Sequence, residues 1–226
     1  ILYVDQGIVN TFSRWGEILL KYYQKTRLAN DADQVLSYLG YWTDAGTYYY
    51  YNHQPFDNYE QCLLEVKKKA DELDIPYGYF QLDSWFYPKD DGCVEWDAIP
   101  EYFPNGIRGL TEQLKLPVVC HNRWFSENTV YKDQFKGWIT ETHPKTVRPS
   151  WDPRSENEKN MRTWSFPTSK EFWDFLMANA NSWGCIAYEQ DWLQPQWRFF
   201  DYLQEDVYNG RRWLLDMAEA AVNYDM

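Results

Sequence analysis

The chain is poor in the residues that build metal and redox sites. It has 226 residues but only four cysteines and three histidines. No two cysteines form a CxxC pair, which excludes the common zinc and dithiol motifs and favours free buried thiols. No histidine belongs to an HExxH motif, the usual helix-borne zinc site of metalloproteases. We therefore expect neither a metal nor a cofactor.

Cations and long apolar runs are also scarce. Lys and Arg number 22 against 34 Asp and Glu, so the net charge is -12. An acidic surface repels nucleic acid and anionic membranes, and no apolar run approaches the roughly 20 residues that span a bilayer. We expect no nucleic-acid partner, no membrane partner, and a neutral or cationic ligand. The sequence has no Asn-x-Ser/Thr acceptor and no signal peptide at its start, and the compartment stays open.

Aromatic residues, in contrast, are abundant. Hydrophobic residues make up 44% of the chain and aromatic residues 19%, including 13 Trp and 19 Tyr. This composition indicates a globular protein with a sizeable core. Trp and Tyr rings also form flat platforms on which the apolar faces of sugars stack. The composition therefore raises a carbohydrate ligand as a hypothesis.

The order of apolar patterns predicts alternating strands and helices. Four stretches read as strands, each ending in polar or aromatic residues, at 35–42, 77–82, 116–120 and 185–192. Helical spacing and capping residues predict helices over 13–24, 57–74, 105–114, 168–183, a stretch ending near 204, and 209–224. Ser13 is the expected N-cap of the first helix, and Asp57 with Glu60 is the expected capping box of the second. The segment 125–166 shows little periodicity and reads as a long connection.

Repeated strand–helix units predict an α/β fold with parallel strands. Polar residues at every strand end, and the absence of a Gly-rich loop after the first strand, favour a (β/α)8 TIM barrel. Four units are present where a barrel needs eight. We expect residues 1–34 to be a lead-in segment from a preceding domain and 35–226 to be the first half of the barrel. The rest of the same polypeptide would complete it.

The fourth strand presents two acids together. Because side chains alternate along a strand, Glu189 and Asp191 share a face, immediately before Trp192 and a turn at Gln194-Pro195. Carboxylates at a strand end are typical of a catalytic site in such a barrel. The alternative is an edge strand whose acids only face water.

The other strands also end in candidate ligand-binding residues. Trp42 and Asp44 follow the first strand, and Asp83 and Trp85 follow the second. The third strand leads into a cluster of polar and aromatic side chains, which comprises His121, Asn122, Arg123 and Trp124. Asp44 and Asp83 are each as consistent with capping as with ligand binding. A single Trp at such a position more often packs, and a lone His is more often hydrogen-bonded in place.

The motifs Tyr-Trp-Thr-Asp at 41–44, Gln-Leu-Asp-Ser-Trp at 81–85 and Glu-Gln-Asp at 189–191 resemble those of a retaining glycoside hydrolase group, the α-galactosidases, raffinose synthases and α-glucosidases of clan D. That group folds as a (β/α)8 barrel. The resemblance assigns the nucleophile to Asp191 and sugar contacts to Trp42, Asp44, Asp83 and Trp85. Two positions depart from it, because Ser84 replaces a second Asp and Glu189 replaces a Lys.

The resemblance implies hydrolysis or transglycosylation of α-galactoside-like sugars through a covalent glycosyl-aspartate. Retaining hydrolysis needs a second carboxyl about 5 to 5.5 Å away as acid/base, and in that group it follows a later strand. We therefore expect it beyond Met226. Further candidate substrate contacts are His121, Arg123, Trp124, Glu189 and Trp192. The alternative function, which the Glu in place of Lys favours, is a catalytically silent carbohydrate-binding or structural protein.

Overall fold

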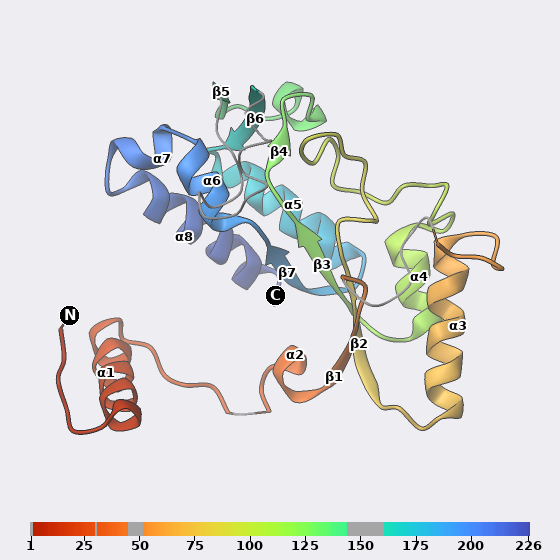
Figure 1. Cartoon of the computed structure of the whole chain (residues 1–226), viewed down its shortest axis with the longest axis horizontal. Coiled ribbons are helices and arrows are strands. Elements are labelled where there is room, and N and C mark those ends of the chain that lie inside the picture. Colours follow the sequence, from red (N-terminus) through yellow and green to blue (C-terminus); the bar gives the residue numbers. More distant parts are fainter. Residues whose placement is uncertain (1, 30, 45–51, 144–160) are drawn as a thin grey trace. The chain divides into compact units, whose positions relative to one another are not determined.

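The computed structural model describes residues 2–29, 31–44, 52–143 and 161–226 (Figure 1). The chain forms two compact units, Ile1–Ser37 and Tyr38–Met226. The first unit holds helices α1 (Ile8–Tyr22) and α2 (Gln34–Ser37). Helix α1 begins after Gly7, whose φ of 84° is easy only for glycine. Ser13 therefore lies inside the helix, and its prediction as the N-cap was wrong.

Residues 35–37 were predicted as the start of the first strand, but they are helical. The Oδ1 atom of Asp33 accepts the backbone N–H groups of Val35 at 2.8 Å and Leu36 at 3.2 Å. This cap starts a short helix ahead of the strand, since Asp readily bonds the free N–H groups at a helix N-terminus. The strand itself is β1 (Leu39–Trp42), shorter than predicted.

The second unit is built on a four-stranded parallel sheet, which confirms the α/β prediction. The strands β1, β2 (Tyr77–Leu82), β3 (Val118–Asn122) and β7 (Cys185–Gln190) lie in this order, with parallel pairing throughout. Helices α3 (Tyr59–Glu72), α4 (Gly106–Leu114) and α5 (Lys170–Ser182) fall between successive strands (Figure 1). Within the described residues the sheet is open, with β1 and β7 at its edges.

Side-chain alternation divides the sheet into an apolar and a polar face, as the sequence predicts. Phe80 and Leu82 on β2, with Val118 and Cys120 on β3, are buried in the core cluster that also includes residues of the three helices. The intervening positions include Gln81, His121 and Glu189. Polar side chains therefore collect on the face opposite the helix-packed core.

Helix α3 is capped differently from the prediction. Asn58 is the N-cap, and its Oδ1 accepts the N–H of Gln61 at 2.9 Å. Glu60, which the sequence placed in a capping box with Asp57, is instead only 2% exposed. Its carboxylate accepts the backbone and side-chain N–H groups of Asn105 at 3.0 and 2.7 Å. A charged group so buried needs such donors, and here they tie α3 to the start of α4.

The long connection after β3 contains a small antiparallel sheet that the sequence did not predict. Its elements are β4 (Phe125–Ser126), the 3-10 helix η1 (Val130–Asp133), β5 (Trp138–His143) and β6 (Arg162–Pro167). The strand order is β4-β6-β5. Along β4 and β6 buried and exposed side chains do not alternate, and β5 has no buried side chain. Part of the predicted connection, 144–160, lies outside the described residues.

Three helices follow β7 where two were predicted. They are α6 (Leu193–Phe199), α7 (Tyr202–Glu205) and α8 (Asn209–Asn223). The backbone of Phe200 is extended, with φ -85° and ψ 115°, and therefore ends α6. Its side chain is fully buried and holds the segment between α6 and α7 against the core. Helix α8 packs on α5 through the side that includes Trp213, Met217 and Ala220.

Candidate active site

The predicted site residues come from the carboxyl ends of the four parallel strands. The strand register places Trp42 beside Gln81 and His121 beside Glu189. Asp191 directly follows β7, and its N–H continues the sheet pairing by donating to the backbone oxygen of Asn122 at 2.9 Å. Parallel strands bring their ends to one edge of the sheet, which is where such folds bind ligands.

Asp191 is held by two hydrogen bonds to its carboxylate. Oδ2 lies 3.2 Å from Nε2 of His121, and Oδ1 accepts the N–H of Trp192 at 2.6 Å. Burial disfavours the charged form. The bonds from His121 and Trp192 and the positive charge of Arg123 outweigh burial and hold the pKa of Asp191 below its ordinary value of 3.8. The side chain remains 46% exposed, so an ionised, oriented carboxylate is open to a ligand.

His121 is buried, with a side-chain exposure of 2%, and both ring nitrogens are engaged. Nε2 faces Asp191, and Nδ1 lies 3.1 Å from the hydroxyl of Tyr87. The rings of Tyr87 and His121 are stacked, with centroids 6.2 Å apart and planes 7° from parallel. His121, a predicted substrate contact, therefore supports Asp191 from below the surface. Tyr87 is a residue that the sequence analysis missed.

Glu189 points to the same polar face but has a different environment from Asp191. Its Oε2 accepts the Nε2 hydrogen of Gln81 at 2.7 Å. Burial raises the pKa of Glu189 above its ordinary 4.5, and the nearby charges of Asp83 and Asp191 act in the same direction, whereas the hydrogen bond from Gln81 opposes it. The two acids of the fourth strand are thus shifted in opposite directions.

Thr43 links the ends of β1 and β2. Its hydroxyl accepts the N–H of Asp83 at 2.9 Å, and its carbonyl accepts the indole N–H of Trp85 at 2.8 Å. One carboxylate oxygen of Asp83 accepts the N–H of Ser84 at 2.5 Å. These bonds fix the loop that bears Asp83 and Trp85, both of which remain partly exposed beside the polar face.

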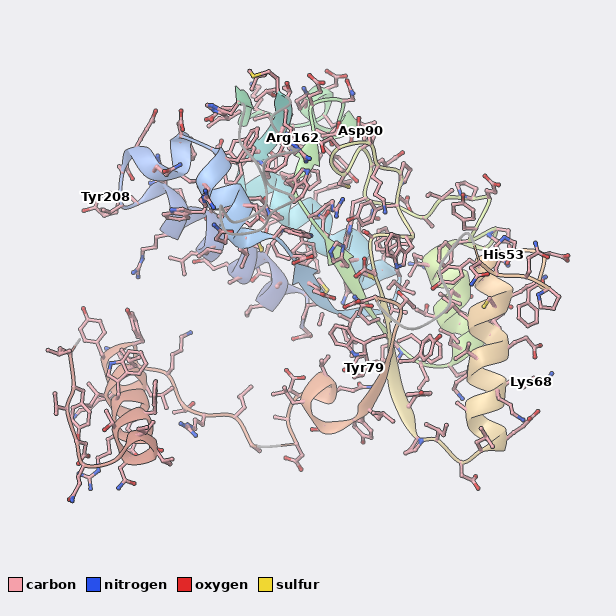
Figure 2. The ribbon with its side chains drawn as sticks, viewed as in Figure 1. His53, Lys68, Tyr79, Asp90, Arg162 and Tyr208 are labelled. Carbon is pink, nitrogen blue, oxygen red and sulfur yellow. The ribbon has the colours of Figure 1, made fainter. Side chains whose placement is uncertain are left out.

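Trp42 and Asp44 stand at the edge of the site. Trp42 is 40% exposed, and its indole donates to the hydroxyl of Tyr79 at 3.3 Å (Figure 2 labels Tyr79). Tyr79 in turn crosses Gly40 so closely that a Cβ there would lie 2.3 Å from its ring. Asp44 is exposed and precedes residues that lie outside the described part of the chain.

Two cations border the acids. Arg123 lies over the Trp124 ring, with its Cζ 4.8 Å from the centroid, and its Nε atom is buried without a hydrogen-bond partner among the described residues. Lys89, which the sequence analysis missed, lies 4.4 Å above the Trp85 ring and donates to the Ser84 hydroxyl at 3.2 Å. Burial, and then repulsion from Arg123, lowers the pKa of Lys89 to about 8.

A tryptophan cluster supports the end of β3. Trp124 and Trp164 are stacked, with centroids 4.2 Å apart, and the Trp192 ring meets Trp124 edge-on at 5.7 Å. Trp124 is 3% exposed, so its ring packs beneath the site and does not present a free face for a sugar. Trp192 is partly exposed and has a φ of 59°, an unusual value for a residue other than glycine. Such backbone conformations collect at functional sites.

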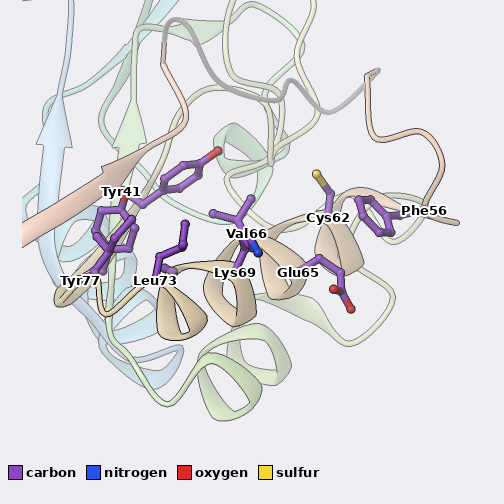
Figure 3. Close-up of a pocket in the computed structure, with 10 residues that line it drawn as sticks. Tyr41, Phe56, Cys62, Glu65, Val66, Lys69, Leu73 and Tyr77 are labelled. Carbon is purple, nitrogen blue, oxygen red and sulfur yellow. The ribbon is translucent and has the colours of Figure 1, made fainter.

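Two other features lie apart from these strand ends. An apolar pocket of about 430 Å³ lies along α3 beside β1, where Tyr41, Phe56, Val66 and Leu73 are among its lining residues (Figure 3).

On the small antiparallel sheet, Glu141 and His143 approach Asp201 closely enough to share a metal ion, the one such grouping within the described ranges. Glu141 already accepts the N–H of Asp201 at 2.9 Å and contacts His143 at 2.7 Å. The sequence predicts no metal, and none of these three residues is among the predicted site residues.

None of the described helices is both long and apolar enough to cross a membrane.

Comparison with known proteins gives a likeness in fold. No protein-family model and no curated protein sequence matches the chain. Among solved structures, a GH31 α-xylosidase from a soil metagenome, complexed with xylose, matches with a TM-score of 0.51 and 14% identity. The match covers 75% of this chain and 27% of that one, so this chain spans about a quarter of its length. A xylosidase from Aspergillus niger matches with a TM-score of 0.41 and 14% identity, over 59% of this chain and 19% of that one.

Proposed function

We propose that this chain forms the nucleophile-bearing part of a retaining glycosidase acting on α-linked sugars. The observation that carries the proposal is Asp191: an ionised, half-exposed carboxylate, oriented by two hydrogen bonds, at the carboxyl end of the parallel strand β7. Retaining hydrolysis requires such a carboxylate to attack the anomeric carbon. The likeness in fold to a GH31 α-xylosidase supports the same reaction class.

The remaining strand-end residues take binding roles in this proposal. Asp44 and Asp83 accept sugar hydroxyls, and the partly exposed rings of Trp42, Trp85 and Trp192 stack on sugar faces. Glu189 and Arg123 contact polar groups of the same sugar.

The sugar is proposed more broadly than the resemblance implied. The α-galactoside-like preference remains a prediction, and the similar structure with a TM-score of 0.51 is an α-xylosidase, so α-xylosides belong in the same substrate panel. The acid/base group is proposed to come from a later strand. In this view the remainder of the polypeptide pairs with the open edges at β1 and β7 and completes a barrel.

The test is covalent labelling of the full-length polypeptide. A set of mechanism-based fluoroglycosyl fluorides, with galactose, glucose and xylose configurations, is incubated with the protein, and the labelled peptide is identified by mass spectrometry. We expect the label on Asp191 and its loss in Asp191→Asn. Asp97→Asn, which changes an exposed acid away from the strand ends, is the control and keeps the label.

Labelling of another residue would overturn the role of Asp191. Binding of sugars by calorimetry without labelling or turnover would instead favour the silent carbohydrate-binding protein, for which the Glu at 189 is the supporting observation.

A further inference from the structure

A buried chain of hydrogen bonds runs from Tyr87 through His121 to Asp191. The Tyr87 hydroxyl lies 3.1 Å from Nδ1 of His121, and Nε2 of the same ring lies 3.2 Å from the Asp191 carboxylate. Tyr87 is 1% exposed and His121 is 2% exposed. The indole N–H of Trp96 donates to the backbone oxygen of His121 at 2.9 Å and fixes the strand at that point. Three segments far apart in sequence thus meet at Asp191.

The burial of Tyr87 decides which protons the imidazole carries. The hydroxyl hydrogen of Tyr87 needs an acceptor, because a buried donor left without one costs about 1 to 3 kcal/mol. Among the described residues that acceptor is Nδ1 of His121. If Nδ1 accepts, it carries no hydrogen, and a neutral ring then carries its hydrogen on Nε2, facing Asp191.

The alternative protonation states satisfy fewer groups. A ring with its hydrogen on Nδ1 would turn the Nε2 lone pair toward an ionised carboxylate. A doubly protonated ring would bond Asp191 well but would leave the Tyr87 hydroxyl hydrogen without that acceptor. The arrangement in which Tyr87 donates to His121 and His121 donates to Asp191 satisfies all three groups.

We propose that Tyr87 and His121 act as positioning residues: Tyr87 holds His121 as a neutral Nε2–H donor, and His121 thereby keeps Asp191 ionised and oriented for attack. This inference rests on the proposed role of Asp191 as nucleophile. It differs from the predicted role of His121 as a sugar contact, because neither ring nitrogen is left for a ligand.

Other titratable and charged groups face this chain of bonds. Glu189 lies next to His121 on the neighbouring strand, and Asp83 lies across the polar face. Arg123 acts on both Asp191 and Tyr87, while Tyr188 and Cys93 lie near Tyr87. The burial of Tyr87 raises its pKa well above the ordinary 10, so it keeps its hydrogen at every working pH. Burial opposes the charged form of Asp191, but the hydrogen bonds from His121 and Trp192 and the charge of Arg123 outweigh it, so the pKa of Asp191 is lowered.

Nitrogen NMR on the full-length polypeptide, labelled with ¹⁵N-histidine, reads the state of the ring directly. The His121 signals are identified by their absence in His121→Gln. We expect one nitrogen without a hydrogen, at Nδ1, and one with a hydrogen, at Nε2. In Tyr87→Phe we expect a mixed pattern in which Nδ1 also carries a hydrogen, because the hydroxyl that donates to Nδ1 is gone. Tyr131→Phe is the matched control. The buried Tyr131 hydroxyl accepts the backbone N–H of Trp96 at 2.9 Å, so the variant loses a comparable bond that does not involve the His121 ring.

Kinetics on the same variants test the effect on Asp191. We expect His121→Leu to lower kcat about 10- to 100-fold more than His121→Gln, whose amide still offers a donor, and to move the acidic limb of the kcat/KM profile to higher pH. A hydrogen on Nδ1, or a doubly protonated ring in the wild type at neutral pH, would overturn the proposal. So would equal losses and equal pH profiles in the Leu and Gln variants. Because the NMR pattern does not depend on turnover, a protein with the expected pattern but no labelling at Asp191 would refute the proposed function and leave the assignment of the ring intact.

Discussion

Gln81 and Glu189 are joined across the polar face of the sheet by a hydrogen bond of 2.7 Å, although they lie 108 residues apart in the chain. The Gln81 amide is used at both ends, because its oxygen accepts the N–H of Thr43 at 3.2 Å. This second bond fixes which end of the amide faces Glu189. Gln81 therefore connects three strands of the sheet and presents a donor to the acid.

Gln81→Leu tests this connection. We expect it to lower the free energy of unfolding by about 1 to 3 kcal/mol, because the buried Thr43 N–H and the Glu189 carboxylate both lose a partner. Urea denaturation measures the loss. Gln61→Leu is the control, since Gln61 is an exposed residue at the start of α3, and its change should cost much less. Equal costs would show that the Gln81 bonds are not important to the fold.

The opposite shifts of the two acids predict opposite pH effects on stability. The pKa of Glu189 is raised in the folded protein, chiefly by burial, so folding favours the protonated side chain. The contribution of Glu189 to stability is therefore lost as pH rises from 4.5 through the pKa of the folded protein. The pKa of Asp191 is lowered in the folded protein. Its contribution to stability is therefore present above pH 3.8 and is lost as pH falls through the pKa of the folded protein.

Unfolding midpoints of Glu189→Gln and Asp191→Asn across this range separate the two effects. Relative to the wild type, we expect Glu189→Gln to lose less stability as pH rises above 4.5, and Asp191→Asn to lose less as pH falls below 3.8. Parallel curves for the wild type and either variant would contradict the corresponding shift.

The buried carboxylate of Glu60 predicts a large loss of stability on its removal. It accepts three hydrogen bonds, two from Asn105 and one from Gln113 at 2.8 Å. We expect Glu60→Ala to lower the free energy of unfolding by about 3 kcal/mol, because the donors of α4 lose a charged acceptor. Glu65→Ala, which removes a half-exposed acid paired with Lys68 on the same helix, is the comparison and should cost below about 1 kcal/mol. A small effect at Glu60 would mean that water replaces the carboxylate.

The stacked pair of Trp124 and Trp164 predicts a link between the small antiparallel sheet and the candidate site. Trp164 is fully buried and also donates to Asp91 at 2.8 Å. We expect Trp164→Ala to destabilise the protein by about 3 to 5 kcal/mol. Trp164→Phe keeps an aromatic face and should recover a large part of this loss. Equal destabilisation by both variants would argue that the Asp91 bond matters more than the stacking.

The open sheet edges predict the behaviour of these 226 residues expressed alone. Leu39 and Trp42 on the edge strand β1 are 56% and 40% exposed. Exposed edge strands pair readily with other chains, so we expect self-association by light scattering. A longer polypeptide that contains further strands should remain monomeric under the same conditions. A stable monomer of the short chain would contradict the proposal that further strands cover these edges.

The sequence by itself determined the succession of helices and strands in the parallel sheet and the sharing of one face by Glu189 and Asp191. Both follow from local rules, because helical and strand periodicities depend on neighbouring residues. It also indicated Asp83 and Trp85 at a strand end. It did not reveal β4, β5 and β6, since short strands without clear alternation are defined by their pairing partners and not by their own pattern.

Only the tertiary structure decided the state of each site residue. His121 reads as a ligand contact until Tyr87 and Asp191 take up its two nitrogens, and Trp124 reads as a platform until Trp164 covers its ring. The partners lie 34 to 70 residues away for His121. Burial and hydrogen bonding at that separation depend on how the strands and loops pack, and no local pattern in the chain encodes them.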